Sequence, residues 1–136
     1  MSYKYRLLPT TSILSAELFA IKESLRIISN LPPSKWVIYS DSLNALQCLN
    51  ELSLKHPLAV KSLDLHHSSI SNGSTVDLVW IPSHVGIRGN EDADKIAKTA
   101  LGHCSEVGKS FGIDSGWVSV PPPNSVPPPN RISLLQ

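Results

Sequence analysis

Apolar residues recur at helical spacing in four separate stretches of the chain. The first stretch runs from Ser15 to Ile28, after the Thr10-Thr11-Ser12 cluster, which can cap its start. The second follows Ser42, the third follows His56-Pro57, and the fourth ends at Gly102, which is placed to cap its C-terminus. Each stretch predicts a helix, and the positions that define the four helices are Leu18, Ile21, Leu25 and Ile28; Leu43, Leu46, Leu49 and Leu52; Val60, Leu63, His67 and Ile70; and Ala93, Ile96, Ala97, Ala100 and Leu101.

Two shorter runs have the length and composition of strands. Lys35 to Ser40 is largely apolar, which is typical of a strand buried on both faces, and Asp41 stands at its C-terminal end. Val76 to Trp80 forms a second predicted strand that ends at Pro82, and Tyr3 to Leu8 has room for one more. The order helix, strand, helix, helix, strand, helix therefore predicts an α/β layered domain with at least two parallel strands.

The chain changes character after Gly102. Residues 103–136 are poor in periodic apolar positions, and the sequence S-V-P-P-P-N occurs twice in tandem over 119–130. Six prolines in twelve residues favour polyproline II over a packed core. We therefore expect one domain over 3–102 and a Pro-rich flexible tail over 103–136. The tail is interpreted as a solvated linker or terminus, with docking of 119–130 on a polyproline-reading module as the alternative.

Length and charge narrow the class of protein without pointing to a partner. The 136 residues suit one modest domain, and 12 lysines and arginines against 11 acids give little net charge to draw the chain to nucleic acid or to a membrane. No apolar run approaches the roughly 20 residues needed to span a bilayer. Cys48 and Cys104 make no disulfide framework, so the sequence indicates a soluble, intracellular protein, with cytoplasm and nucleus equally open.

Asp41 is the first candidate for chemistry because of its place in the predicted fold. In open α/β domains ligands bind beyond the carboxyl ends of the strands, where Asp41 stands. Withdrawing a carboxylate from water there is costly unless a metal, a hydrogen-bond donor or a positive charge compensates it. Asp41 is equally suited to cap the helix that follows, so a catalytic and a capping role both remain open.

Two further acids border the apolar faces of predicted helices. Glu17 lies beside Leu18 on the first helix, a position where an exposed, inert glutamate is common. Asp94 borders the apolar face of the last helix, whereas Glu91 and Asp92 suit the start of that helix, where its dipole favours negative charge.

His84 lies between the second strand and the last helix, in a loop made mobile by Gly86 and Gly89. A histidine in such a loop is either simply exposed or available for proton transfer near neutral pH, and both interpretations remain open. The other histidines show no ligand spacing with the cysteines that would indicate zinc; they are His56, His66, His67 and His103.

Three strings of residues occur in an informative order and structural context. They are S-A-E-L-F-A-I in the first predicted helix, V-I-Y-S-D-S-L-N-A-L-Q across the end of the first long strand, and W-I-P-S-H-V-G-I-R-G-N-E-D-A-D-K-I-A from the second strand into the last helix. Together they resemble type 1 ribonuclease H over about residues 3–101, and most of all the ribonuclease H domains that follow reverse transcriptase in non-LTR retrotransposons. The last string is the most specific of the three.

The resemblance implies a fold, an activity and a site. The fold is a five-stranded mixed sheet flanked by helices, and the activity is endonucleolytic cleavage of the RNA strand in an RNA–DNA hybrid, which is read through 2′-hydroxyls and phosphates. Matched to the family's motif, Glu17, Asp41 and Asp94 look like its metal ligands, and His84 looks like the histidine that assists proton transfer and product departure. The implied cofactor is a pair of Mg²⁺ or Mn²⁺ ions about 4 Å apart, one activating water and the other stabilising the leaving oxygen.

The sequence departs from the family at its start. The family begins with two strands, the first of which carries an aspartate that bridges both metals, whereas here only the third strand, around Tyr3 to Leu8, precedes Glu17 and no acid precedes it. We therefore expect a mixed sheet that lacks the first two strands, as in an N-terminally truncated domain, and feeble or no hybrid cleavage. The alternative is a non-catalytic retroelement remnant that binds nucleic acid or a protein.

Overall fold

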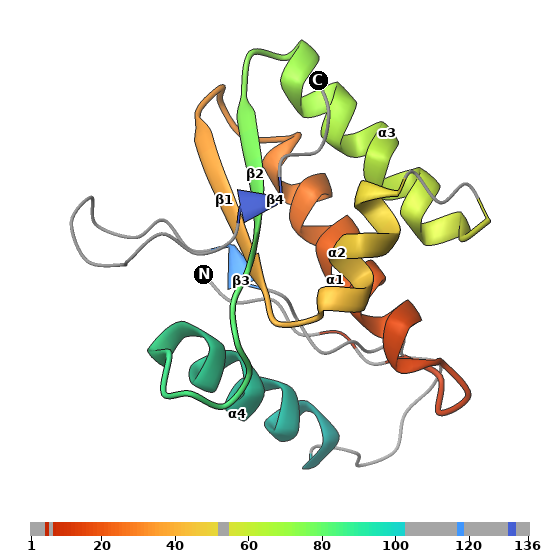
Figure 1. Ribbon diagram of the computed structural model, residues 1–136, viewed down its shortest axis with the longest axis vertical. Coiled ribbons are helices and arrows are strands. Elements are labelled where there is room, and N and C mark those ends of the chain that lie inside the picture. Colours follow the sequence, from red (N-terminus) through yellow and green to blue (C-terminus); the bar gives the residue numbers. More distant parts are fainter. Residues whose placement is uncertain (1–4, 6, 52–54, 103–116, 119–130, 133–136) are drawn as a thin grey trace.

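The computed structural model describes residues 5, 7–51, 55–102, 117–118 and 131–132. Helices α1, α2 and α3 lie together on one side of the strands, and α4 lies beyond the end of β2 (Figure 1). Among the described helices, none is long and apolar enough to cross a membrane. The elements in chain order are α1 (Ile13–Ile28), β1 (Lys35–Ser40), α2 (Leu43–Asn50), α3 (Pro57–Ser71), β2 (Thr75–Trp80), α4 (Arg88–Gly102), β3 (Trp117–Val118) and β4 (Arg131–Ile132).

The four predicted helices and the two longer predicted strands are all present. The hydroxyl of Ser12 caps α1 by accepting a hydrogen bond from the backbone N–H of Ser15 at 3.1 Å, as the cluster before this helix predicted. β1 has the predicted bounds, although its two faces differ: Ile38 and Ser40 are buried, whereas Tyr39 is half-buried. α4 begins at Arg88, earlier than its apolar residues alone indicated.

The sheet is mixed, with the strand order β3-β1-β2-β4. β1 and β2 are parallel over their full lengths, from the Lys35–Thr75 pair to the Ser40–Trp80 pair, so their carboxyl ends meet at one edge. α2 and α3 form the crossover between them. The predicted α/β fold with a parallel strand pair is therefore confirmed.

The two outer strands come from the segment expected to be a flexible tail. β3 pairs antiparallel with Ile38 and Tyr39 of β1, and β4 pairs antiparallel with Leu78 and Val79 of β2. Four residues of 103–136 thus belong to the sheet, whereas the proline repeat over 119–130 lies outside the described residues. Of the strand expected at the N-terminus, Tyr5 forms an isolated β-bridge, and residues 3, 4 and 6 lie outside the described residues.

The core lies between α1, α2, α3 and the inner face of the β1–β2 pair. The apolar stripe of α1 is fully buried there, as its helical spacing predicted, and meets side chains from both central strands. Burial of such side chains is the main favourable term in folding. The largest fully buried apolar side chains are Leu18, Ile21, Leu25, Ile28, Ile38, Leu46, Leu49 and Leu78.

The buried face of α3 differs from the predicted one by a single position. The structure buries Ala59, Ser62, His66 and Ser69, whereas the sequence pattern predicted Val60, Leu63, His67 and Ile70. Polar side chains are tolerated inside a protein when their hydrogen bonds are made. The serine hydroxyls meet this condition by donating back to the carbonyl oxygens one turn earlier, at 2.8 Å for Ser62 and 2.9 Å for Ser69.

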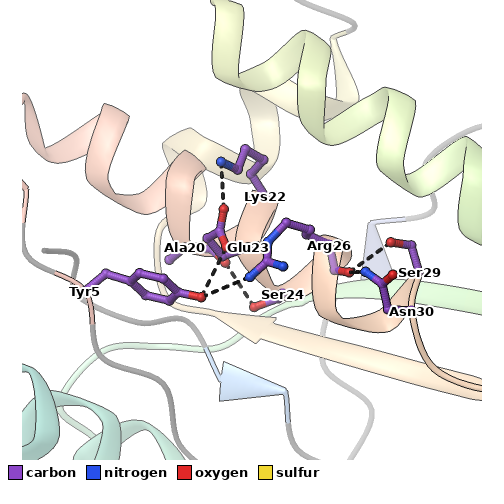
Figure 2. A network of polar contacts seen from close by, with 8 residues as sticks. All are labelled: Tyr5, Ala20, Lys22, Glu23, Ser24, Arg26, Ser29 and Asn30. Atoms are coloured by element: carbon purple, nitrogen blue, oxygen red, sulfur yellow. Dashed lines mark hydrogen bonds and ion pairs between the residues drawn. The ribbon is translucent and has the colours of Figure 1, made fainter. Parts of the chain in front are cut away.

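A buried carboxylate on α1 ties the start of the chain to this helix (Figure 2). Oε1 of Glu23 pairs with Nζ of Lys22 at 2.7 Å, and Oε2 pairs with Nε of Arg26 at 2.7 Å. The hydroxyl of Tyr5 donates to the same Oε2 at 3.1 Å. Burial alone would raise the pKa of the Glu23 carboxyl, but the hydrogen bonds and charges of Lys22 and Arg26 outweigh it and lower the pKa below its ordinary value of 4.5.

Candidate functional site

Asp41 lies at the carboxyl end of β1, where three elements converge. Its backbone oxygen accepts hydrogen bonds from the N–H of Leu43 at 3.1 Å and from the indole Nε1 of Trp80 at 3.3 Å. Trp80 is the last residue of β2 and belongs to the pair at the end of the strand register. Both parallel strands therefore contribute to fixing the backbone that carries the Asp41 carboxylate.

Asp41 does not cap α2, which corrects one of the two roles open to it from the sequence. The N-cap is Ser42, whose hydroxyl accepts from the backbone N–H of Ala45. The carboxylate of Asp41 is directed elsewhere: its Oδ2 accepts a hydrogen bond from Nδ2 of Asn90 in α4 at 3.2 Å. The aspartate thus joins the end of β1 to a helix that follows β2.

Asp94 lies one helical turn after Asn90. The two residues share a face of α4 with Ala93, which is buried, so this face is turned toward the rest of the protein. Oδ2 of Asp94 is 3.5 Å from Nδ1 of His84, and about a third of the Asp94 side chain is exposed. α4 and the loop before it therefore bring two of the predicted site residues together.

The backbone of His84 is in an unusual conformation for a residue with a side chain. Its φ of 54° lies in the left-handed region, which costs a residue other than glycine roughly 1–2 kcal/mol. The His84 side chain is 73% exposed, so solvent reaches the ring from outside the contact with Asp94. His84 is thus exposed, as one of the two interpretations of the sequence had it, and it also contacts an acid.

Glu17 is half-buried in α1 and is not gathered with the other acids into a metal centre. Among the described residues there is no group of three or more histidine, cysteine, aspartate or glutamate side chains able to hold a metal ion. Oδ2 of Asp41 already accepts from an amide, and Oδ2 of Asp94 contacts a histidine. The arrangement of Glu17, Asp41 and Asp94 therefore does not fit a preformed site for a divalent ion.

The remaining acids at the start of α4 have surface roles. Oδ2 of Asp92 lies 3.9 Å from Nε of Arg88, and Oδ1 of Asp92 lies 3.9 Å from Nζ of Lys95. The helical spacing of the three residues places these charges side by side. Glu91 is in the first turn of α4, where the helix dipole favours a negative charge. The position of Glu91 agrees with the role expected at the start of the helix, whereas Asp92 pairs with charges on the helix surface instead.

Two other histidines have structural partners. Nδ1 of His56 accepts from the backbone N–H of Leu58 and so caps α3, which leaves Nε2 of the neutral ring to donate to the hydroxyl of Ser15 at 3.2 Å. His66 is buried, and its Nε2 donates to the carbonyl oxygen of Val76 at 3.0 Å. Both ring nitrogens of His56 and Nε2 of His66 are therefore engaged in helix capping and packing contacts.

The sequence did not assign a role in the site to Asn90 or to Trp80. Asn90 precedes Asp94 by four residues, so helical spacing could have placed the two on one face. Its partner Asp41 is 49 residues away along the chain, and no local pattern reveals such a contact. The Trp80 indole was read only as an apolar strand residue, and its N–H bond to Asp41 depends on the strand register.

Comparisons with known proteins show the family of the chain. The family model described as RNase H matches residues 2–102. Over 88 residues, 60% of each chain, the protein is 34% identical to ribonuclease HI of Helicobacter pylori. It is 33% identical to ribonuclease H of Helicobacter acinonychis, again over 88 residues and 60% of each chain. The chain thus spans about 60% of the length of these curated relatives, and no solved structure matches it significantly. Because the family model covers well over half of the sequence, the chain belongs to the RNase H family.

Proposed function

We propose that this chain descends from ribonucleases of RNA–DNA hybrids, and that the reaction of this lineage is endonucleolytic cleavage of the RNA strand. The observation that carries the proposal is the meeting of Asp41 with α4 at the carboxyl end of the parallel β1–β2 pair. Ligands of α/β domains bind at such an edge. Membership of the RNase H family supports hydrolysis of hybrids as the chemistry of the lineage.

Four side chains are proposed to serve this reaction. Asp41 and Asp94 are brought to one edge through α4, and Glu17 completes the set of acids by resemblance to the family's motif. His84 is proposed to move protons, which its exposure and its contact with Asp94 support. RNase H proteins generally use divalent metal ions, so the proposed cofactor is Mg²⁺ or Mn²⁺, although the described residues hold no ready-made centre for such an ion.

We expect the catalytic output of this chain to be low. Among the described residues no three acids are gathered into one group. Carboxylates that lie apart cannot share an ion, and the charge that builds up on a phosphate during cleavage then lacks a counter-charge. Recognition of the hybrid through 2′-hydroxyls and phosphates does not depend on this counter-charge. We therefore expect the chain to bind the hybrid even where it cleaves it poorly.

A non-catalytic binding domain is the second candidate. The observation that favours it is the Asn90 amide on Asp41, because that bond occupies a carboxylate oxygen without the help of a cation. In this case the chain would be a retroelement remnant that binds nucleic acid or a protein. The retroelement lineage itself is proposed from the three sequence strings around Glu17, Asp41 and His84.

Hybrid binding in the presence and absence of Mg²⁺ separates the two candidates. Fluorescence anisotropy would measure the affinity for a labelled RNA–DNA hybrid, with unlabelled duplex DNA of the same sequence as the competitor. We expect the hybrid to bind several-fold more tightly than the duplex. Binding should also be tighter in Mg²⁺ than in EDTA, because a phosphate of the bound hybrid can supply ion ligands that the acids alone do not provide. Asp41→Ala should abolish the gain from Mg²⁺, whereas Asp64→Ala, at an exposed position of α3, should retain it.

Two outcomes would decide against the ribonuclease proposal. Hybrid affinity that is equal in Mg²⁺ and EDTA would favour the non-catalytic domain. Equal affinity for the hybrid and the duplex would contradict recognition of the RNA strand altogether.

A further inference from the structure

A side-chain hydrogen bond joins two parts of the strand-end site that are distant in sequence. Nδ2 of Asn90 donates to Oδ2 of Asp41 at 3.2 Å. Both residues are half-buried, so water competes less for this bond than for a fully exposed one. A hydrogen bond to an ionised acceptor is also stronger than one between neutral groups. The bond is therefore suited to hold α4 against the end of β1.

The position of Asn90 on α4 extends the effect of this bond to Asp94. Residues four apart in a helix are neighbours on one face, and the burial of Ala93 shows that this face meets the protein. A helix is stiff over one turn, so fixing Asn90 at Asp41 also fixes Asp94. The contact between Asp94 and His84 then fixes the exposed ring of the loop.

We infer that Asn90 is the positioning residue of the strand-end site. Its amide orients the Asp41 carboxylate and sets the distance of Asp94 and His84 from it. The inference rests on the proposed function, in which these three side chains serve hybrid cleavage. Asn90 acts through Asp41 and is not assigned a contact with the substrate.

Hydrogen exchange tests whether this bond holds α4 in place. Exchange of the amides of α4 would be measured in the wild type, Asn90→Ala, Asp41→Ala and the double variant. Loss of one charge-assisted bond should raise the opening equilibrium constant of α4 roughly tenfold in each single variant. The double variant should open no more than either single variant, because both substitutions remove the same bond.

Matched variants separate this bond from general damage to the fold. Asn50→Ala replaces an exposed asparagine at the last position of α2 and should leave the exchange of α4 unchanged. Asp41→Asn keeps an oxygen that can accept from Asn90, so it should preserve much of the protection that Asp41→Ala loses. If Asp41→Ala acted through general damage to the end of β1, Asp41→Asn would give no such rescue. Additive effects in the double variant, or unchanged protection in Asn90→Ala, would overturn the inference.

A spectroscopic signature follows the bond directly. In a proton–nitrogen correlation spectrum, the side-chain amide of Asn90 should shift in Asp41→Ala and return toward its wild-type position in Asp41→Asn. An Asn90 side-chain amide signal that keeps its wild-type position in both variants would also overturn the inference. Loss of hybrid binding with this coupling intact would count against the proposed function instead, so the two failures can be told apart.

Discussion

At the scale of single residues, the buried carboxylate of Glu23 is met by partners on both of its oxygens. The Glu23 carboxylate is 9% exposed, yet both of its oxygens are engaged by Lys22, Arg26 and Tyr5 (Figure 2). The same bond with Glu23 raises the pKa of the Arg26 guanidinium. A buried acid without such partners would be expected to take up a proton instead.

Glu23→Gln should lower the free energy of unfolding by about 2 kcal/mol at neutral pH, because it removes charge-assisted hydrogen bonds. The folded-state pKa of Glu23 is lowered, so its stabilisation is fully present above the ordinary value of 4.5 and is lost as the pH falls through the folded value. Urea unfolding should therefore show a difference in the free energy of unfolding between the wild type and the variant at pH 7. This difference should shrink as the pH falls below about 4.5. Glu51→Gln, at an exposed glutamate, is the control. A difference that persists unchanged to pH 3, well below that value, would contradict the assignment.

Two glycines near the site should respond in opposite directions to the same substitution. Gly86 has a φ of 77°, so Gly86→Ala should destabilise the fold by about 1 kcal/mol even though a Cβ there meets open space. Gly89 lies in the first turn of α4 with equally open space, and Gly89→Ala should stabilise by about 0.5 kcal/mol. Thermal unfolding would measure the change in melting temperature of each variant. Equal changes in the two variants would show that backbone conformation does not determine the effect of the substitution.

At the scale of elements, hydrophobic spacing located the helices better than it located their buried faces. The stripe of α1 was predicted correctly because its four apolar positions are all buried, although Glu23 and Ser24 are buried beside them. On α3 the pattern was off by one position, since Ser62 and Ser69 satisfy their hydroxyls within the helix and can be buried at little cost. His66 adds a bond to β2 that depends on the folded chain. Such bonds are invisible to a pattern of apolar residues.

Adjacent serines on α3 test this correction. Ser69 is 1% exposed, so Ser69→Leu should overpack the core and destabilise by about 1–3 kcal/mol. Ser68 is exposed, and Ser68→Leu should change stability by no more than about 0.5 kcal/mol. Urea unfolding would measure both variants. The reverse order would contradict the burial of Ser69 in the core.

At the scale of the whole molecule, the sheet is bordered by strands that the sequence did not predict. β1 and β2 each pair over six residues with one another, but over only two residues with β3 and with β4. An apolar strand with a bare edge invites pairing with other chains. Residues 117–118 and 131–132 therefore protect the central pair, and their proline-rich surroundings masked this role in the sequence.

Removal of the outer strands should expose the edges of the sheet. A chain ending at residue 102 lacks β3 and β4, and we expect it to unfold at a lower temperature and to aggregate more readily. A chain ending at residue 132 keeps both strands and is the control. Light scattering during a thermal ramp measures both effects. Identical curves for the two chains would show that the outer strands contribute nothing.

The site could be predicted from the sequence only in part. Asp41 was placed at a strand end and Asp94 on the last helix, because strand and helix boundaries can be read locally. The bond between Asn90 and Asp41 spans 49 residues, and it required the parallel register of β1 and β2 to be known. The fold that results is the mixed α/β arrangement of the RNase H family, with a small sheet.

The most direct test is cleavage of a labelled RNA–DNA hybrid by the purified chain in Mn²⁺, with Asp41→Asn as the matched variant. We predict product at or barely above background for both proteins, because the described acids are not gathered into one group. Robust cleavage by the wild type that disappears in Asp41→Asn would contradict this prediction, since it would show that the chain assembles a working catalytic site from the acids it has.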